Sequence, residues 1–415
     1  MHPKWHCDIA TPVQFVSMCC IELTATHRLG WALAVATAFP LAETAFSASD
    51  PTLQVNLART SRSLVLSWVG VSAVPYQVEA GSALTGWTNA SPVMTGTGSQ
   101  LSFTNSLTAQ SRQFFRVKRV FPASPGSAAF DPATGLLTIV GDALHTVINV
   151  ANDGTGVIVI NGGAMPITGG VATVSNTVLI QVLGSPGDDQ ITVGSSLPPA
   201  HIFGAEGNDT LNGGSGIDMI VGGPGNDAIS GRQGNDILYL DGGDTVIWNP
   251  GDGSDLVEGQ GGNNTLVFNG ANVSENITLS ANGSRLRLTR DVAAISLDVN
   301  GVQTVNIQAL GGADNLAVDS LAGTAVTQVN IDLAAAGGGG DGQADAVTIN
   351  GTASPDTINI AANAGAVGIT GLAAQVQIAH PEVANDTLIV NGLGGIDSFS
   401  LGPGVTALIG TILNQ

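Results

Sequence analysis

The residues of this chain that are best suited to chemistry are aspartates that recur at every ninth position between glycines. Residues 204–239 read as four consecutive lines, GAEGNDTLN, GGSGIDMIV, GGPGNDAIS and GRQGNDILY. Each line has Gly at its first and fourth places, Asp at its sixth and an aliphatic residue at its eighth. Carboxylates and uncovered backbone carbonyls suit a hard cation with six to eight oxygen ligands, which is Ca²⁺. Mg²⁺ fits less well because it keeps its waters.

The last three places of each line can form only a short strand, because the flanking residues are turn formers. Side chains alternate along a strand, so the eighth place should face a core. That place holds Leu211, Ile220, Ile229 and Leu238. Two lines then make one coil, and stacked coils bury a narrow aliphatic ladder. Glycines allow the positive φ angles of the turns and leave carbonyls uncovered. The fold class predicted is all-β, with a parallel β-roll or β-solenoid.

Alternate lines lie on the same edge of such a coil, so a cation should bridge one line and the next but one. The strongest predicted carboxylate pairs are Asp209 with Asp227 and Asp218 with Asp236, and less regular pairs are Asp189 with Asp209, Asp227 with Asp244 and Asp236 with Asp255. Asp244 should face the neutral Asn264, which predicts a weaker site. With backbone carbonyls at the first and third places, the predicted metal ligands are Asp189, Gly204, Glu206, Asp209, Gly213, Ser215, Asp218, Gly222, Pro224, Asp227, Gly231, Gln233, Asp236, Asp244 and Asp255.

The line Gly-Gly-x-Gly-x-Asp-x-apolar-x resembles the hemolysin-type (RTX) calcium-binding repeats of secreted bacterial proteins. The resemblance implies a parallel β-roll, Ca²⁺ in the turns and folding after export. Ala205 and Arg232 depart from glycine at the second place, which a carbonyl ligand tolerates. A looser similarity to larger secreted proteins of this family covers residues 129–415. Members exported by the type I route carry a C-terminal signal, whereas this chain shows an N-terminal leader.

The calcium-binding region is expected to span residues 136–270, with its core at 184–267. Residues 271–415 keep a diluted rhythm, as in ALGGADNLAV (309–318), and predict a degenerate β-solenoid-like region. There the aspartates often lack glycines, so turn capping without metal is the favoured interpretation and Ca²⁺ the alternative. These residues are Asp314, Asp345, Asp356, Asp386 and Asp397. The arginines of SRLRLTR, Arg285, Arg287 and Arg290, are expected on one face of an exposed strand.

Residues 49–121 alternate in strand fashion between Gly, Ser and Asn turns, which predicts a small β-sandwich. Trp68 and Trp87 are its expected core anchors. Through LVLSW, YQVEAGSALTGW and FFRV the segment resembles fibronectin type III-like modules of bacterial secreted proteins, which implies a spacer or adhesion role. The Pro/Ser/Ala/Gly-rich residues 122–135 are predicted to be a linker.

Residues 1–48 are predicted to be a leader with a signal peptide. His27 and Arg28 precede an apolar run (29–42) and a tail of small residues. That run is too short for a membrane span, which needs about 20 residues. All three cysteines precede residue 21, so the mature protein would have no disulfide and no thiol. Translation is expected to start at Met1 or Met18. The sequence leaves open whether the C-terminus is native or has been cut from a longer chain.

Charge separates the regions and limits the partners. Residues 49–121 hold six basic and two acidic side chains, whereas residues 122–415 hold 27 acidic and four basic ones. Phosphate binding needs clustered Lys and Arg, so nucleic acid is not expected as a partner. No H-E-x-x-H or G-x-S-x-G motif is present, and the histidines after the leader lie far apart in sequence. The chain is therefore predicted not to be an enzyme, with a calcium-dependent polysaccharide lyase as the rival.

Together these features predict a secreted, extracellular bacterial protein that binds Ca²⁺ and has a structural, surface or adhesive role. Its expected partners are calcium ions and a polysaccharide or protein of the cell surface or matrix, without a membrane span. The alternative function is a non-catalytic or polysaccharide-active portion of a larger calcium-dependent extracellular enzyme or adhesin. A flexible Gly-rich linker is a further alternative, against which the strict period argues.

Overall fold

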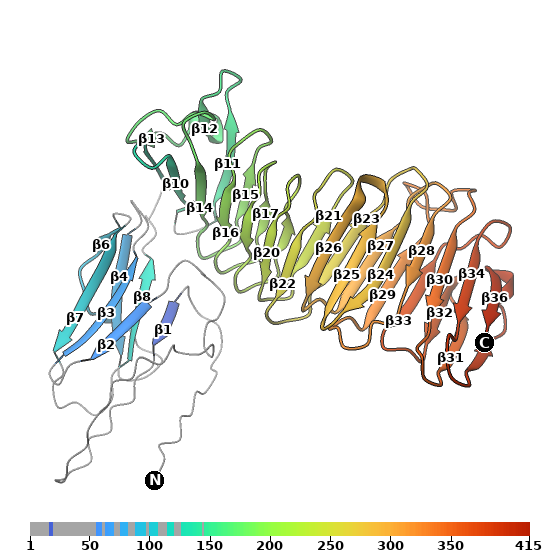
Figure 1. Ribbon diagram of the computed structural model, residues 1–415. Coiled ribbons are helices and arrows are strands. Elements are labelled where there is room, and N and C mark those ends of the chain that lie inside the picture. Colours follow the sequence, from blue (N-terminus) through green and yellow to red (C-terminus); the bar gives the residue numbers. More distant parts are fainter. Residues whose placement is uncertain are drawn as a thin grey trace, which may run out of the picture.

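The computed structural model describes residues 16–19, 55–59, 63–69, 75–81, 88–96, 99–106, 114–119, 126–142 and 145–415. In these ranges the regular secondary structure is almost entirely β-strand, and Figure 1 shows two long sheets winding together from green to red. The described helices are short 3-10 turns, namely η1 (Asn161–Gly163), η2 (Val292–Ala294) and η3 (Val405–Ala407). None of the helices in these ranges is long and apolar enough to cross a membrane.

The two long sheets together form the roll. In spatial order, the first sheet contains β13 (Ile167–Thr168), β9 (Ser127–Asp131), β10 (Leu136–Val140), β14 (Leu179–Leu183), β16 (Ala200–Phe203), β18 (Met219–Val221), β20 (Ile237–Leu240), β22 (Leu256–Gly259), β26 (Ile295–Asn300), β25 (Arg285–Arg290), β24 (Asn276–Asn282), β28 (Asn315–Val318), β30 (Ala346–Asn350), β34 (Thr387–Asn391) and β36 (Gly410–Asn414). The second sheet contains β12 (Ile158–Ile160), β11 (Val147–Asn152), β15 (Gln190–Val193), β17 (Thr210–Asn212), β19 (Ala228–Ser230), β21 (Thr245–Trp248), β23 (Thr265–Asn269), β27 (Thr304–Gln308), β29 (Gln328–Asp332), β33 (Gln375–Ala379), β32 (Ala366–Thr370), β31 (Thr357–Asn363) and β35 (Ser398–Leu401).

Within the nine-residue lines, successive strands alternate between the two sheets, as the period predicts. Leu211 of β17 lies beside Ile229 of β19, and Ile220 of β18 lies beside Leu238 of β20, both in parallel register. All four side chains are fully buried in one apolar cluster between the sheets. The prediction of an all-β parallel roll is therefore confirmed.

Residues 271–415 continue the same two sheets. Each sheet is interrupted there by one three-stranded antiparallel segment, β24–β25–β26 in the first sheet and β31–β32–β33 in the second. Outside these segments the pairing is again parallel, for example between β28 and β30. Within 122–135, expected to be a linker, β9 pairs antiparallel with β10 and belongs to the first sheet.

The N-terminal strands form two small antiparallel sheets. One contains β1 (Val16–Cys19), β8 (Phe114–Arg119), β4 (Pro75–Gly81), β5 (Thr88–Asn89) and β6 (Met94–Thr95), and the other contains β2 (Val55–Arg59), β3 (Ser63–Val69) and β7 (Gln100–Ser106). Trp68 is fully buried, as expected of a core anchor, whereas Trp87 lies outside the described residues. The predicted leader also lies outside them, except for β1, which pairs with β8.

The N-terminal sheets share an apolar cluster with the outer face of the first sheet. Trp68 and Tyr76 belong to the same cluster as Phe203 and Val221, which stand at the ends of β16 and β18. At the equivalent ends of strands in the second sheet the outward residues are polar, for example Asn212. The two outer faces of the roll therefore differ, and only the apolar one is covered by the N-terminal strands.

Stacked turns in the roll come too close for side chains at the fourth place of each line. A Cβ added to Gly234, whose φ is +133°, would lie 1.9 Å from the carbonyl oxygen of Gly216. The same place in the first clean line, Gly207, has a φ of +129° and would meet the carbonyl oxygen of Gly187 at 2.4 Å. Glycine is required there by both the backbone angle and the contact with the next coil.

We predict that Gly234→Ala destabilises the roll by more than about 1 kcal/mol, because both the positive φ and the contact with Gly216 oppose a Cβ. The matched control is Gly368→Ala in β32, where φ is not positive and the nearest atom would lie 3.9 Å away. Thermal unfolding followed by circular dichroism, with calcium present, should show a lower Tm for Gly234→Ala only. Equal Tm values for the two variants would contradict the stacking argument.

Candidate metal centre

The turn aspartates form two ladders, one along each edge of the roll. In both ladders the backbone N–H of an aspartate donates a hydrogen bond to Oδ1 of the aspartate one coil further on. The first ladder contains Asp189, Asp209, Asp227 and Asp244, joined by bonds of 2.7, 2.8 and 2.9 Å. The second ladder contains Asp218, Asp236 and Asp255, joined by bonds of 2.7 and 2.9 Å.

Every carboxylate pair that the nine-residue period predicts is brought together in these ladders. Asp209 adjoins Asp227, and Asp218 adjoins Asp236, each across a separation of 18 residues. The neutral Asn264 accepts the bond from the backbone N–H of Asp244 at 3.0 Å, also as predicted. The contact within each pair is a backbone N–H to carboxylate bond, which the accepting aspartate takes at Oδ1.

In three of these aspartates the second carboxylate oxygen is buried without a hydrogen-bond partner. These oxygens are Oδ2 of Asp209, Asp227 and Asp236, whose residues are only 1–2% exposed. A buried charged oxygen without a partner is costly, so each of them calls for a cation or a proton. The first glycine of each line leaves room for that oxygen, since an added Cβ at Gly204 would lie 2.3 Å from Oδ2 of Asp209.

The backbone conformation at the second place of the line separates these three aspartates from others. Ala205, Gly223 and Arg232 precede them in their lines, and all three have a positive φ, at 104°, 104° and 65°. Gly214 has no positive φ, and its N–H donates to Oδ2 of Asp218 at 2.6 Å. An αL residue at the second place therefore coincides with an unpartnered Oδ2 later in the same line.

Asn264 shows what surrounds this oxygen in the turns. Its Oδ1 takes the ladder bond, and its Nδ2, which replaces Oδ2 of an aspartate, donates to the carbonyl oxygens of Gly261 and Gly301 at 2.9 Å each. Backbone carbonyls thus converge on this position, where an aspartate would place another acceptor. A cation between the acceptors satisfies all of them, so the donor set fits Ca²⁺.

Burial dominates the electrostatics of the ladders. It raises the pKa of Asp227 to about 9 and the pKa values of Asp209 and Asp236 to about 8 each. Neighbouring carboxylates raise these pKa values further, while the ladder hydrogen bonds oppose the rise. Burial also raises the pKa of Asp255, to about 7. The charged state of the ladders is therefore unfavourable without a counter-ion.

The remaining predicted ligands lie in the same turns. In the described ranges, no group of three His, Cys, Asp or Glu side chains is arranged around a single metal position, so backbone carbonyls must complete any site. The third-place carbonyls of Glu206 and Pro224 accept N–H bonds from the preceding coil, at 2.6 and 3.1 Å. The other residues predicted to bind the metal through their backbone carbonyls occupy the first or third places of these turns, namely Gly204, Gly213, Ser215, Gly222, Gly231 and Gln233.

Asp241 is a half-buried acidic residue that the sequence prediction missed. It opens the shortened turn that ends at Asp244, and its Oδ1 has no hydrogen-bond partner in the described structure. Burial raises the pKa of Asp241 to about 6, and the nearby Asp244 adds to the rise. The signal was present as the acidic pair in DGGD, but the line is out of register with the nine-residue pattern.

The arginines of β25 do not share one exposed face as expected. Arg285 pairs with Glu258 and Asp298 on the outer side, whereas Arg290 points inward because the pleat of β25 places it with Leu286 and Leu288. The buried Arg290 forms an ion pair with the buried Glu275, and its guanidinium lies 5.4 Å from the ring centre of Trp248. At Glu275 the chain therefore supplies its own counter-ion.

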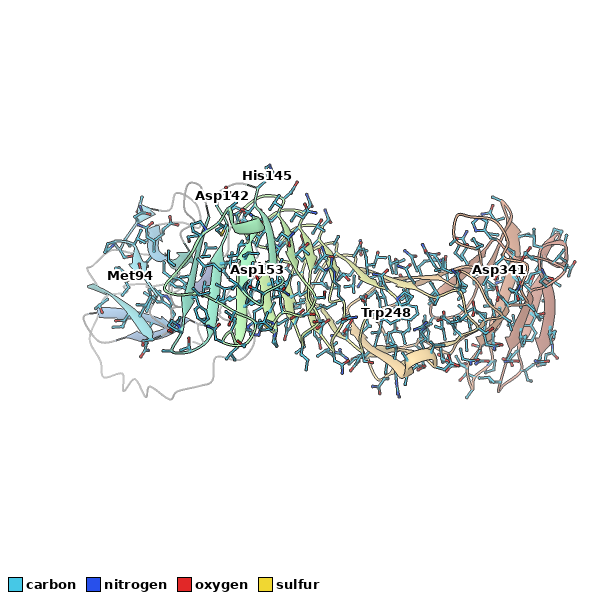
Figure 2. All side chains as sticks on the ribbon, turned by 90° about the horizontal axis from the view of Figure 1, so that it is seen from above. Met94, Asp142, His145, Asp153, Trp248 and Asp341 are labelled. Atoms are coloured by element: carbon cyan, nitrogen blue, oxygen red, sulfur yellow. The ribbon has the colours of Figure 1, made fainter. Side chains whose placement is uncertain are left out.

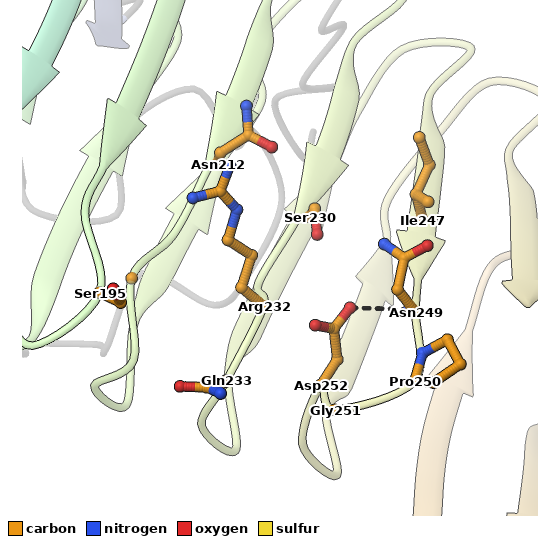
Figure 3. Close-up of a pocket in the computed structure, with 11 residues that line it drawn as sticks. Ser195, Asn212, Ser230, Arg232, Gln233, Ile247, Asn249, Pro250, Gly251 and Asp252 are labelled. Atoms are coloured by element: carbon orange, nitrogen blue, oxygen red, sulfur yellow. Dashed lines mark hydrogen bonds between the residues drawn. The ribbon is translucent and has the colours of Figure 1, made fainter. Parts of the chain in front are cut away.

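A surface cavity of about 450 Å³ lies over the ends of strands in the second sheet, shown in Figure 3. Its walls include Arg232 and Gln233 from one turn and Asp252 from another, and the backbone N–H of Asn249 donates to Asp252 at 2.7 Å. Arg232 is the single basic residue of the lines at 184–267. Polar and apolar side chains both line the cavity, and neither Asp209 nor Asp227 is among its lining residues.

Comparisons with known proteins agree with the repeats. The family model for the RTX calcium-binding nonapeptide repeat (4 copies) matches residues 201–220, 212–247 and 251–272. Repeats of this kind bind Ca²⁺ structurally, and proteins that carry them are typically secreted. No curated protein matches the chain. Among solved structures, the extracellular lipase LipA from Serratia marcescens is similar with 12% identity over 50% of this chain and 38% of that chain, with a TM-score of 0.14. That likeness is too low to support an argument.

We predict that the calcium-free roll becomes less stable as the pH rises from about 5 to 9. The pKa values of Asp209, Asp227 and Asp236 are higher in the folded state than the ordinary 3.8, so folding takes up protons. The stability from this uptake is fully present below about pH 4 and is lost as the pH passes through 8 to 9. Tm values measured in chelator across this range should therefore fall.

The control for this pH dependence replaces carboxylates without removing the ladder bonds. The triple variant Asp209→Asn, Asp227→Asn, Asp236→Asn should flatten the fall in Tm, because the amide does not titrate and its Oδ1 keeps the ladder bond, as in Asn264. Asp153→Asn, at an exposed position where hydrogen bonds lower the pKa of the carboxyl below 3.8, should leave the fall unchanged. A Tm in chelator that rises with pH would be inconsistent with this electrostatic account.

Proposed function

We propose that this chain is a secreted, non-enzymatic calcium-binding protein whose acidic roll becomes rigid when its turns take up Ca²⁺. The observation that carries the proposal is the set of buried, unpartnered carboxylate oxygens inside turns that match the RTX calcium-binding repeat. Asp209, Asp227 and Asp236 would hold the ions, together with backbone carbonyls of the facing turns. The role that follows is structural or adhesive, at a bacterial surface or in its matrix.

The charge balance supports this proposal. Residues 122–415 carry 27 acidic and four basic side chains, and three of the four basic ones lie together in β25. The ladders at 184–267 therefore face a surplus of negative charge, with Arg232 as the one basic side chain of their lines. Extracellular modules bind Ca²⁺ at about 10⁻⁴ to 10⁻³ M. A site of that strength would be empty at cytosolic calcium levels and filled outside the cell, which couples rigidity to export.

The N-terminal part of the proposal concerns export and attachment. The two small antiparallel sheets support a fibronectin type III-like module that serves as a spacer or adhesion unit. Its shared apolar cluster with Phe203 and Val221 would hold it against the calcium-binding end of the roll. An N-terminal signal peptide before this module would direct the chain through the membrane. Sequencing the N-terminus of the protein recovered from culture medium tests this part directly.

We predict that removing calcium unfolds the region around residues 184–267, because its stacked carboxylates repel each other over a narrow core. Circular dichroism of the full chain in excess chelator should show a loss of β-structure, which excess calcium restores and the same concentration of magnesium restores less well. A β spectrum that is identical in chelator and in calcium would overturn the proposal.

We predict further that the two edges of the roll respond separately to substitution. Asp236→Ala removes the unpartnered Oδ2 from the ladder that contains Asp218 and should weaken calcium binding on that edge. Protection of the turn amides around Asp209 and Asp227, measured by hydrogen exchange in calcium, should change far less. The matched variant Asp227→Ala should give the opposite pattern. Equal loss of protection on both edges in both variants would show that the ladders are not independent.

A further inference from the structure

Asp314 lies beyond the residues that match the repeat family, in the turn ALGGAD (309–314) before β28. Its Oδ1 accepts the backbone N–H of Glu275 at 2.8 Å, so it belongs to a ladder like those of the matched repeats. The residue is only 1% exposed, and its Oδ2 has no hydrogen-bond partner among the described residues. Asp314 therefore shares the state of Asp209, Asp227 and Asp236.

The backbone of this turn also has the conformation found before the three other unpartnered aspartates. Leu310, at the second place of the turn, has a φ of +72°, although its sequence offers no glycine there. A bulky residue rarely adopts this conformation, which costs free energy that the surrounding structure must offset. The turn departs from the repeats at its first place, where Ala309 replaces glycine.

The neighbouring turn brings two further carboxylates. Oδ1 of Asp345 accepts the backbone N–H of Asp314 at 2.9 Å, which continues the ladder. Oδ2 of Asp341 accepts the backbone N–H of Gly312 at 3.1 Å, so this side chain reaches into the turn of Asp314. The four consecutive lines at 204–239 carry no carboxylate at the equivalent second place. Figure 2 shows Asp341 in the C-terminal part of the roll, remote from the N-terminal sheets.

Other turn carboxylates in the same region have partners within the protein. Glu275 has its ion pair with Arg290. Oδ2 of Asp356 accepts the backbone N–H of Thr352 at 2.6 Å, and Oδ2 of Asp386 accepts that of Glu382 at 2.7 Å. Among the described aspartates of residues 271–415, the unpartnered buried Oδ2 is that of Asp314. Metal-free capping thus suits Asp356 and Asp386 but leaves Asp314 unexplained.

We propose that the stacked turns of Asp314 and Asp345 form a further Ca²⁺ site, with Asp341 as an additional carboxylate. The unpartnered Oδ2 of Asp314, the carboxylate of Asp341 and the backbone carbonyls of the two turns would supply only oxygen, which favours Ca²⁺ over transition metals. Burial raises the pKa of Asp314 to about 7, and the charged groups that add to this rise are all carboxylates. The site extends calcium-dependent order beyond the repeats that the sequence identifies.

Hydrogen exchange on the full chain, measured by mass spectrometry with calcium and with chelator, tests this site. In the wild-type protein, amides of 309–318 and 341–350 should exchange at least about tenfold more slowly in calcium. Asp314→Asn should abolish that difference and lower the number of calcium ions bound per chain by one, measured by equilibrium dialysis. The ladder bond should survive, because Asn264 accepts the same bond elsewhere in the roll. Asp341→Asn, which removes the second carboxylate of this turn, provides a second variant with the same expected result.

The control variant is Asp356→Asn, whose Oδ2 is already satisfied by Thr352, and it should change neither protection nor the number of ions bound. Calcium-dependent protection at 204–239 reports on the matched repeats alone. If it is present while 309–350 shows no calcium dependence, or if Asp314→Asn binds as many ions as the wild type, the further site is excluded and the proposed function stands. Absence of protection at 204–239 would instead refute the proposed function.

Discussion

The roll depends on one repeated interaction, the hydrogen bond from the backbone N–H of a turn aspartate to Oδ1 of the aspartate one coil further on. This bond sets the distance between stacked turns and forces each carboxylate out of water, as at Asp227, which is 2% exposed. It uses only one of the two oxygens. In Asp209, Asp227 and Asp236 the second oxygen is buried without a partner, so the contact that orders these turns also creates the demand for a cation or a proton.

This constraint explains why burial of the apolar core alone contributes too little free energy to stabilise the fold. Each nine-residue line contributes one fully buried aliphatic side chain, such as Ile220 or Ile229, against one buried carboxylate, such as Asp218 or Asp227. Apolar burial is worth about 25 cal/mol per Å², while an uncompensated buried charge costs several kcal/mol. Cation binding removes the larger of these opposing terms. Under the proposed function, the folding of the roll and its calcium binding would therefore be one equilibrium.

Much of this arrangement follows from the sequence. The nine-residue period determines which aspartates adjoin, because two lines make one coil, and it places the eighth residue in the core. It does not determine which carboxylates are left unpartnered. Asp218 and Asp236 have the same motif, yet the N–H of Gly214 reaches one of them while the positive φ at Arg232 removes that donor from the other. This choice is made by backbone angles, which permissive glycine-rich turns leave open.

Other features depend on contacts between segments that are distant in the sequence. The pleat of β25 turns Arg290 inward, but its partner Glu275 lies on a turn before β24, so the ion pair required the antiparallel segment to be known. The packing of Trp68 against the roll was equally inaccessible, because it pairs the N-terminal strands with outward residues of the first sheet. Periodicity describes repeated neighbours, and neither contact is repeated.

The chain uses three solutions for a buried turn carboxylate, and their distribution has a functional consequence. Glu275 is neutralised by Arg290, and Asp356 is satisfied by the N–H and hydroxyl of Thr352. In both cases the partner is a residue of the same chain, so neither solution depends on an ion from the surroundings. The aspartates whose Oδ2 has no partner would depend on an ion from outside; they are Asp209, Asp227, Asp236 and Asp314. Order in the roll should therefore respond to calcium turn by turn. The turn of Glu275, which is paired with Arg290, should stay ordered between segments that respond.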